Sequence, residues 1–221
     1  MESKTREIKV EDLGLIDYQT AWDKQKEMVI ALQNDESSNT VLLCEHNHVY
    51  TFGKSANRNN LLINDSFLNQ IGAQKFEIER GGDITYHGPG QLVGYPILNL
   101  HQLGMGVKKY VDVLEESIIE TLLKFNIKTE RMEGLTGIWL TEGLPRKIAA
   151  IGIKVSRGIT MHGFALNVNT DLSYFNHMIP CGIADKGVTS MQKELHRAIE
   201  MKAVKEAFAK AFLKNIANNN F

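Results

Sequence analysis

The sequence predicts an α+β fold in which mixed β-sheets are flanked by helices. Short apolar runs that are typical of strands interleave irregularly with longer runs of helical periodicity along the 221 residues. They do not alternate as repeated strand-helix-strand units, which would indicate a purely parallel sheet. The chain contains no internal repeat, low-complexity tract or linker rich in proline and serine. A single domain spanning residues 1–221 is therefore expected.

The N-terminal part predicts a helix followed by two strands. Residues 18–32 carry apolar side chains at helical spacing, and a polar run rich in Asn, Asp and Ser ends the helix. Residues 41–44 then form an apolar run that is typical of a core strand. A second such run follows at residues 49–52 and ends at Gly53.

The central part predicts an extended segment and a long helix. Residues 91–100 are typical of a strand, but Pro96 favours an edge or bulged position because proline cannot donate to a sheet ladder. Between residues 108 and 125, apolar side chains recur at spacings of three and four, which predicts an amphipathic helix.

The C-terminal half predicts a hairpin, a further strand and a helix. Residues 134–140 and 147–155 have the pattern of two strands, with the turn at residues 142–145. Residues 163–168 predict a third strand. In the C-terminal segment, helical spacing places on one face Val204, Phe208 and Phe212.

Composition and charge narrow the class of protein. The 25 basic and 26 acidic residues give a net charge of −1, so the basic surface expected of a nucleic-acid binder is missing. The N-terminus lacks the apolar segment of a signal peptide, and no apolar run approaches about 18 residues. Neither Cys44 nor Cys181 belongs to a CxxC pair, which fits a reducing compartment. We expect a cytoplasmic protein that binds neither nucleic acid nor membranes.

The segment RGGDITYHGPGQ at residues 80–91 is unusual because four of its twelve residues are glycine. It matches neither the GxxxxGK[ST] nor the GxGxxG phosphate-binding pattern. An extended run and a rigid Gly-Pro-Gly corner follow the first two glycines, which is unlike a flexible linker. We interpret the segment as one wall of a pocket, where Gly81 and Gly82 let backbone lie against a ligand. His87 can either transfer protons or shape this pocket.

Two residues are candidates for chemistry. Cys181 lies between a proline and a glycine, a setting that presents a thiol, whereas the alternative is a buried, inert cysteine. Lys147 opens an apolar strand, where it can either lie in solvent or lower the pKa of a nearby thiol and pass protons. Cys44 follows an apolar run and is interpreted as structural.

A metal site is not predicted, although residues 44–48 contain three residue types that bind zinc. His46 and His48 are only two positions apart, and a second cluster with the spacing of a zinc site is absent from the sequence. A strand face explains the two histidines at least as well. No metal and no cofactor are expected.

Three motif-rich segments occur in the order RGGDITYHGPGQLVGYPILNL, KIAAIGIKVSRGITMHGFALNVNTDLSYF and HMIPCGI. They resemble the signature segments of the lipoyl(octanoyl) transferase family, the octanoyl-[acyl-carrier-protein]:protein N-octanoyltransferases. The earlier segment LLCEHNHVYTFGKSAN is similar to that family's N-terminal strand region. The resemblance runs from about residue 41 to about residue 190. Gly158 departs from it, since many members carry a bulky aromatic residue there, which affects only local packing.

The resemblance implies the biotin/lipoate protein ligase fold, which is like that of class II aminoacyl-tRNA synthetases. It implies transfer of an octanoyl group from octanoyl-acyl carrier protein to a lysine of lipoyl domains, in 2-oxo acid dehydrogenase E2 subunits and in the glycine cleavage H protein. Cys181 would carry the octanoyl group as a thioester, and Lys147 would tune that thiol. A monomer is expected. The acyl-binding residues implied are Arg80, Gly81, Gly82, Asp83, Ile84, Thr85, Tyr86, His87, Ala150, Ile151, Gly152, Gly163, Phe164 and Ala165.

Several points stay open at the level of sequence. A lipoate-type ligase of similar fold would activate its acid with ATP and would not need Cys181, and a non-catalytic module would only dock a lipoyl domain. Ile151 and Phe164 suit an eight-carbon chain. Oxyanion donors are expected among backbone N–H groups near Gly152, Gly163 or Gly182. We also expect a basic patch that suits acidic carrier and lipoyl domains, formed by Arg146, Lys147, Lys154 and Arg157.

Overall fold

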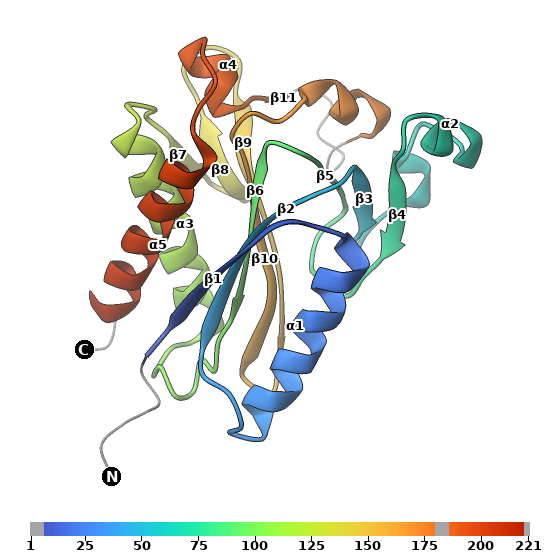
Figure 1. Cartoon of the computed structure of the whole chain (residues 1–221). Coiled ribbons are helices and arrows are strands. Elements are labelled where there is room, and N and C mark those ends of the chain that lie inside the picture. The colour runs from blue at the N-terminus through green and yellow to red at the C-terminus, as the bar shows by residue number, and fades with distance from the viewer. Residues whose placement is uncertain (1–6, 180–185, 219–221) are drawn as a thin grey trace.

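The computed structural model describes residues 7–179 and 186–218, which form an eight-stranded and a three-stranded sheet. The eight-stranded sheet, here called the large sheet, has the order β1-β2-β6-β10-β9-β8-β7, and β11 pairs with β9 (Figure 1). Its strands are β1 (Lys9–Ile16), β2 (Thr40–His46), β6 (Gln91–Ile97), β7 (Glu130–Met132), β8 (Leu135–Leu140), β9 (Arg146–Ser156), β10 (Ile159–Asn167) and β11 (Gly187–Val188).

The three-stranded sheet, here called the small sheet, has the order β4-β3-β5. Both sheets mix parallel and antiparallel pairs: β1 with β2, β11 with β9 and β3 with β4 are parallel, and the remaining pairs are antiparallel. This confirms the predicted α+β fold with mixed sheets. The remaining elements are β3 (Val49–Phe52), β4 (Gln74–Glu77), β5 (Ile84–His87), α1 (Tyr18–Gln33), α2 (Asp65–Gln70), α3 (Val107–Lys124), α4 (Met191–Leu195), α5 (Met201–Asn218) and the 3₁₀ helices η1 (Arg58–Asn60) and η2 (Leu172–His177).

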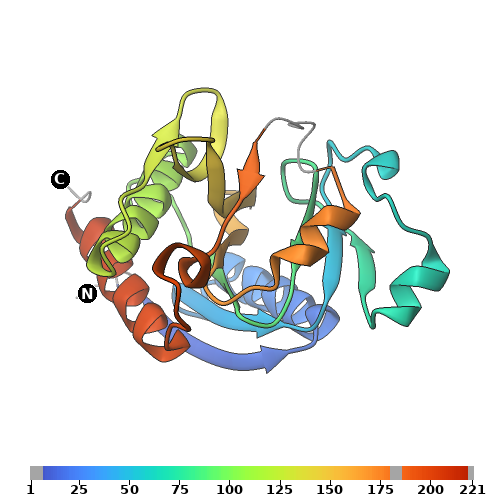
Figure 2. The ribbon, with the colours of Figure 1, turned by 90° about the horizontal axis from the view of Figure 1, so that it is seen from above.

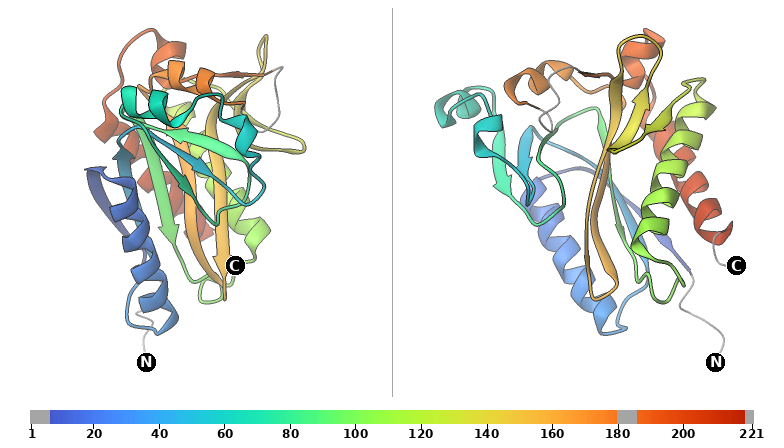
Figure 3. Two further views of the ribbon diagram at one scale, coloured as in Figure 1. Left: turned by 90° about the vertical axis from the view of Figure 1, so that its right-hand side faces the viewer. Right: turned by 180° about the vertical axis from the view of Figure 1, so that it is seen from behind.

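Each face of the large sheet buries its own set of apolar side chains, as strand alternation requires. On β2, Val41 and Leu43 belong to the core cluster under α3 and α5, whereas Leu42 and Cys44 belong to the cluster under α1. Figures 1 and 3 show α3 and α5 on one side of the large sheet, with α1 and the small sheet on the other. Seen from above in Figure 2, the small sheet lies at the end opposite α3 and α5.

Helix α1 begins at a capping residue and ends where the sequence turns polar. The Asp17 side chain accepts a hydrogen bond from Thr20 N at 3.0 Å, which satisfies one of the open donors of the first turn. Leu32 is buried under the sheet, and Trp22 packs at the edge of the same cluster. The predicted helix over residues 18–32 and its inward stripe are therefore confirmed.

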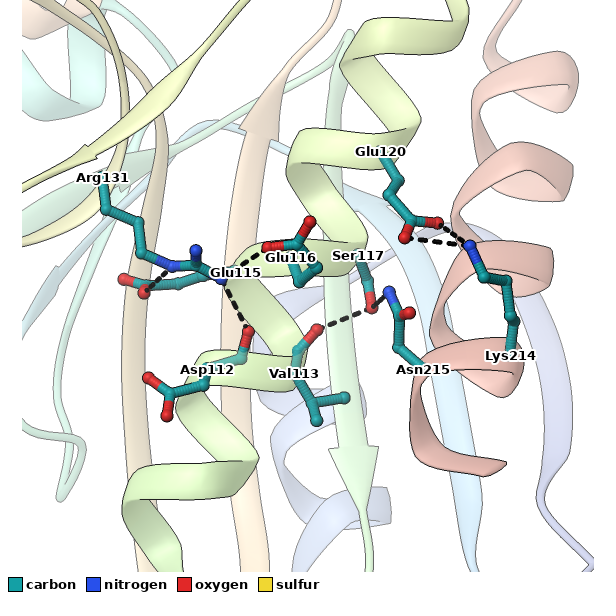
Figure 4. Close-up of polar contacts among 9 residues, drawn as sticks. All are labelled: Asp112, Val113, Glu115, Glu116, Ser117, Glu120, Arg131, Lys214 and Asn215. Carbon is teal, nitrogen blue, oxygen red and sulfur yellow. Dashed lines mark hydrogen bonds and ion pairs between the residues drawn. The ribbon is translucent and has the colours of Figure 1, made fainter. Parts of the chain in front are cut away.

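Helix α5 packs on the large sheet through apolar side chains and contacts α3 through polar ones. Phe208 of α5 is fully buried and lies 4.4 Å, between ring centroids, from Phe164 of β10. Figure 4 shows the polar contacts, in which Asn215 Nδ2 donates to Ser117 Oγ at 3.2 Å and Lys214 forms an ion pair with Glu120 at 3.0 Å. Both predicted long helices are confirmed.

Strand β6 departs from the expectation for its proline. Pro96 does not lie on an edge, because β6 pairs with β2 on one side and β10 on the other. The ladder with β10 runs only from Gln91 to Gly94. Beyond it, the Thr160 hydroxyl accepts from Leu98 N at 3.0 Å and donates to Pro96 O at 2.7 Å. A side-chain hydroxyl thus bridges the strands where proline has no N–H to offer.

The predicted hairpin is present as β8 and β9, and β10 begins at Ile159, before the predicted start at residue 163. Arg157 and Gly158 connect β9 to β10 with φ values of 52° and 79°, as in a type I′ turn. A Cβ on Gly158 would lie 2.1 Å from the His101 ring, so His101 occupies the space of a larger side chain. Strands β1, β4, β7 and β11 and helix α2 were not predicted. Within the described residues, no helix is long and apolar enough to cross a membrane.

The small sheet carries an aromatic and polar cluster. Tyr86 is fully buried, and its hydroxyl lies 2.7 Å from His48 Nδ1. The Tyr174 hydroxyl of η2 lies 3.2 Å from His48 Nε2, and Tyr50 donates to Tyr174 O at 2.8 Å. These contacts attach η2 to the small sheet.

Candidate active site

A cavity of about 470 Å³ lies where the small sheet faces the large sheet. It is lined by residues of β5, β6, β9 and β10 and by Tyr18 of α1. Lys147 is one of the lining residues. The structure therefore brings together three segments that are far apart in the sequence. The predicted binding residues that line the cavity are Arg80, Gly81, Gly82, Asp83, Ile84, Thr85, His87, Ala150, Ile151, Gly152, Gly163, Phe164 and Ala165.

Small residues on paired strands open the cavity. In the antiparallel ladder, Ala150 lies opposite Ala165 and Gly152 lies opposite Gly163. All four positions share the face of the large sheet toward α1 and the small sheet, because alternate residues of a strand share a face. Larger side chains there would fill the space. A Cβ on Gly152 alone would lie 3.0 Å from Arg80 Cδ and 3.1 Å from Gly81 O.

A β-bulge places Lys147 on the same face as these small residues. The pairing of β8 with β9 shifts by one residue between Ile138, opposite Ala149, and Trp139, opposite Lys147. Ile148 and Ala149 are consequently both buried in the cluster under α3 and α5. Strict alternation would have turned Lys147 away from Ala150. The bulge turns it toward the cavity.

The Arg80 side chain fixes the Gly-rich wall. Its Nη2 donates to Thr51 O at 2.7 Å and to Thr51 Oγ1 at 3.0 Å, and its Nη1 donates to Gly81 O at 3.0 Å. Gly81 N donates to Ile153 O at 2.9 Å, which joins the wall to β9. Gly82 has a φ of 88°, a backbone conformation that residues other than glycine rarely adopt. The wall is thus held by hydrogen bonds on both sides.

Asp83 connects the wall to the chain before residue 180. Its Oδ2 accepts from Asn60 Nδ2 at 2.6 Å, and its Oδ1 accepts from Ile84 N at 2.7 Å. Asn60 O in turn accepts from Ile179 N at 2.8 Å. The segment that starts at residue 186 is attached to β9, because Thr189 N donates a hydrogen bond to Lys147 O at 2.9 Å.

His87 is buried and neutral. Gln91 Nε2 donates to Tyr86 O at 3.1 Å and to Asn167 Oδ1 at 2.9 Å, so Gln91 Oε1 faces His87 Nδ1 at 2.8 Å. The Nδ1 atom must therefore carry the proton. Burial lowers the pKa of His87 to about 3, so Nε2 is unprotonated at neutral pH and can accept a hydrogen bond. A group with so low a pKa is a weak proton acceptor, which favours the shaping role.

The network extends to the chain beside Lys147. Asn167 Nδ2 donates to Thr189 O at 3.0 Å. The amide side chains of Gln91 on β6 and Asn167 on β10 therefore link His87 to Thr189 by hydrogen bonds. Thr189 N in turn donates to Lys147 O. The sequence analysis did not single out either amide, although Gln91 ends the RGGDITYHGPGQ motif and Asn167 lies in the strand predicted over residues 163–168.

The sequence of this chain is similar to those of known proteins. The family model of the lipoyl protein ligase A/B catalytic domain matches residues 17–213. The chain belongs to this family. The octanoyltransferase of Cytophaga hutchinsonii is 49% identical over 225 residues, which cover 95% of this chain and 92% of that protein. The octanoyltransferase of Bacteroides fragilis (strain YCH46) is 52% identical over 210 residues, which cover 91% and 95%. The predicted resemblance to octanoyltransferases is confirmed.

Solved structures of the lipoyl and biotin protein ligases share the fold. Lipoate-protein ligase A bound with ATP aligns with a TM-score of 0.73 at 13% identity, over 96% of this chain and 86% of that chain. A bi-partite lipoate protein ligase from Thermoplasma acidophilum aligns with a TM-score of 0.71 at 14% identity, over 96% and 85%. Biotin protein ligase from Aquifex aeolicus has a TM-score of 0.54 at 15% identity, over 98% and 72%. The predicted fold is confirmed.

One of the residues carried over by the resemblance, Tyr86, does not line the cavity. The side chain of Tyr86 packs in the aromatic cluster of the small sheet, and its backbone O accepts from Gln91. Cys181 lies outside the described residues, as does Gly182. Ile151 and Phe164 line the cavity but also pack with the cluster under α3 and α5, so they offer it less surface than expected.

The histidines and the cysteine of β2 and its following turn have protein partners in this member of the lipoyl protein ligase A/B family. His46 Nδ1 donates to Ile16 O at 2.8 Å, and the Tyr95 hydroxyl lies 2.7 Å from His46 Nε2. Burial lowers the pKa of His46 to about 4 and raises the pKa of the Cys44 thiol. Among the described residues, no group of three or more His, Cys, Asp or Glu side chains could hold a metal ion.

The expected basic patch is not gathered at one place. The Arg146 guanidinium makes two hydrogen bonds of 2.7 Å to the Glu194 carboxylate, and Lys154 Nζ lies 3.8 Å from Glu79 Oε1. Lys154 also lies seven positions beyond Lys147 on β9, about 23 Å along an extended strand. The structure does not support a single basic surface formed by these residues around Lys147.

Proposed function

We propose that this protein is the octanoyltransferase of protein lipoylation and that residues 1–221 form one catalytic domain. It transfers octanoyl from octanoyl-acyl carrier protein to a specific lysine of lipoyl domains, through a thioester on Cys181. The names of the relatives support octanoyl transfer. The Thermoplasma acidophilum lipoate protein ligase was studied together with its E2 lipoyl domain, which supports lipoyl domains as acceptors. The glycine cleavage H protein is a second proposed acceptor.

The position of Lys147 is the observation that carries this proposal. Its side chain lines the cavity that the Ala and Gly pairs of β9 and β10 leave open. The backbone on both sides of residues 180–185 is bonded to the same region, through Ile179 to Asn60 and through Thr189 to Lys147. This arrangement supports a site where a thiol from residue 181 meets the lysine and an apolar chain.

The first half-reaction needs a thiolate. The Cys181 thiolate attacks the carbonyl carbon of octanoyl-acyl carrier protein, the carrier's carbon–sulfur bond breaks, and the leaving carrier thiolate takes a proton from the Lys147 ammonium group. One thioester replaces another, so the step is nearly isoenergetic. The ammonium group of Lys147 favours the thiolate by its charge.

The second half-reaction needs a neutral amine. An ordinary lysine, with a pKa of about 10.4, is almost wholly protonated at neutral pH. After acylation the sulfur is neutral, and Lys147, which gave its proton to the carrier thiolate, is a neutral amine. The acceptor's ammonium group loses one proton to water, and Lys147 accepts the second proton as the amide forms. The amine nitrogen then attacks the thioester carbon, an amide forms, and the Cys181 thiolate leaves.

The cavity fits the acyl chain by its chemistry. Its walls are mainly apolar or backbone around the Ala and Gly pairs, and burying each CH₂ of an octanoyl chain contributes about 0.8 kcal/mol. Neutral His87 and the paired Arg80 form polar parts of the same wall. Backbone N–H groups near Gly152 and Gly163 stay candidates for the oxyanion donors, as does Gly182 outside the described residues.

Intact-mass measurement tests the proposal. The protein is incubated with octanoyl-acyl carrier protein in the absence of ATP, and the mass of each protein is recorded. We expect one octanoyl adduct that hydroxylamine removes and that Cys181→Ser does not form, whereas the matched variant Cys44→Ser still forms it. Transfer to a lipoyl domain should follow without ATP.

Two other results would contradict the proposal. Acylation of a lipoyl domain that requires ATP and survives Cys181→Ser would identify a ligase instead. Binding of a lipoyl domain that Cys181→Ser leaves unchanged, without any acyl transfer by the wild-type protein, would identify a docking module.

A further inference from the structure

Lys147 lies against the face of a buried tryptophan. Trp139 of β8 is the cross-strand partner of Lys147 on β9. The Lys147 Nζ atom lies 4.7 Å from the Trp139 ring centroid, within the range of a cation–π contact. Trp139 is only 2% exposed, so its ring is held by its surroundings.

The backbone around this contact is built so that the two side chains can meet. The bulge that turns Lys147 toward the cavity also makes it the direct partner of Trp139. Gly137, two positions before Trp139, has a φ of 116°. A Cβ there would lie 2.6 Å from Ala149 O and 3.4 Å from Lys147 Cε. A side chain at position 137 would therefore press on both the bulge and the lysine stem.

The charged groups on the neighbouring elements engage one another. Arg146, beside Lys147 on β9, pairs with Glu194 of α4 at 2.7 Å. Glu115 of α3, which approaches Gly137 N, pairs with Arg131 of β7 at 2.9 Å. Lys186, just before β11, adds a further positive charge. Both carboxylates thus have guanidinium partners, and the indole face contributes its own stabilisation of the Lys147 ammonium group.

We propose that Trp139 is a positioning residue that holds the Lys147 ammonium group in the cavity wall through its indole face. Within the part of the chain that the structure describes, the indole Nε1 has no hydrogen-bond partner, so the ring face is what Trp139 contributes here. The inference rests on the proposed role of Lys147 in octanoyl transfer. Its physical content, the contact between ammonium and indole, can be tested without that reaction.

NMR of the full-length protein with ¹³C-labelled lysine tests the contact. The Lys147 CεH₂ signal, assigned by its loss in Lys147→Arg, should be shifted upfield by the ring current of Trp139. In Trp139→Leu this upfield shift should vanish, and the pKa of Lys147 should fall by about 0.5 to 1 unit because a cation–π contact favours the charged amine. Trp139→Phe, which keeps an aromatic face, should retain part of both effects.

A matched variant separates positioning from packing. Leu140→Ala removes a buried side chain from the same strand without touching the ring, so the upfield signal should stay. In the transfer reaction, kcat should fall at least about fivefold in Trp139→Leu and recover partly in Trp139→Phe. KM for the carrier should change less than kcat.

The inference would be overturned if Trp139→Leu, shown to be folded by circular dichroism, left the Lys147 CεH₂ chemical shift and the Lys147 pKa unchanged. If Trp139→Leu does not fold, the same comparison is made with Trp139→Phe, where an unchanged shift and titration would overturn it equally. A wild-type protein that shows the upfield signal but forms no octanoyl adduct would refute the proposed function and leave the contact standing. The two failures are therefore distinguishable.

Discussion

The two sheets that face the cavity are stabilised in different ways. The large sheet buries apolar side chains on both faces, in one cluster under α3 and α5 and another under α1. The small sheet also packs an apolar cluster, but directed hydrogen bonds join it to the cavity wall and to η2: Arg80 donates to Thr51, and His48 is hydrogen-bonded to the Tyr86 and Tyr174 hydroxyls. Apolar burial is non-directional and tolerates small shifts, whereas a buried hydrogen bond is lost when its geometry changes.

This difference predicts how substitutions in the two regions should act. A substitution in the large sheet should lower the free energy of unfolding of the whole domain. A substitution in the hydrogen-bonded wall should act first on the shape of the cavity. Lys147 lies on the large sheet, so its backbone belongs to the more broadly packed of the two regions.

The largest effect is expected for Phe208→Ala. This side chain is fully buried between Phe164 and Phe212, so its removal leaves a cavity that the helices cannot close. We expect the free energy of unfolding to fall by about 3–5 kcal/mol, measured by urea denaturation. Leu213→Ala on the same helix, where the side chain is 37% exposed, is the control. A loss below about 1 kcal/mol in Phe208→Ala would refute the view that this cluster stabilises the domain.

Arg80→Lys should have the next largest effect, because an ammonium group cannot reproduce the guanidinium fork to Thr51 and Gly81. We expect a loss of about 2–3 kcal/mol in stability. Amide hydrogen exchange should quicken mainly in β3 and β5. Equal quickening in β6 and β10 would show that the two regions do not differ as described, and Lys154→Arg, a charge-conserving change on β9, serves as control.

Filling the space between Ala150 and Ala165 sharpens the comparison at the cavity itself. Ala150→Leu places a larger side chain on the cavity face. We expect kcat/KM for octanoyl transfer to fall by about 10- to 200-fold, with a smaller loss for a butyryl donor. Val155→Leu, on the opposite face of the same strand, should change neither value appreciably. Equal losses for both donors in Ala150→Leu would show that this space does not hold the acyl chain.

The smallest effect is expected from His87→Gln and depends on pH. The pKa of His87 falls from about 6.5 in the unfolded chain to about 3 in the fold, so between these values the unfolded state binds more protons. Stability therefore falls as the pH drops below about 6.5, by about 2 kcal/mol at pH 5 from this histidine. The variant should lose about 2 kcal/mol less than the wild type between pH 7 and pH 5.

Denaturant titrations at both pH values check this prediction. The comparison at pH 7 serves as the control, because there the packing change contributes but the protonation difference is nearly gone. Identical pH dependence in the variant and the wild type would contradict a buried, neutral His87.

Local sequence patterns predicted most of the elements but not all. The helix over residues 18–32 and the hairpin of β8 and β9 follow from periodicity and turn chemistry, which act over a few residues. Strand β1 was missed because its residues are mostly exposed or half-buried, so no clear apolar alternation marks it. The segments that surround the cavity were recognised from their motifs, whereas Gln91 and Asn167 were not, since a buried amide is polar and carries no apolar pattern.

The sequence by itself determined the fold class through its local periodicity. Its resemblance to the octanoyltransferases implied the segments that meet at the cavity, because their motifs can be read without the fold. Only the tertiary structure decided which face Lys147 takes, because the one-residue bulge against β8 reverses the face of Lys147 relative to the residues that follow the bulge on β9. It also decided that Nδ1 carries the His87 proton, because that follows from Gln91, Tyr86 and Asn167 on three strands. Residues distant in the chain set these features, and no short window of sequence contains them.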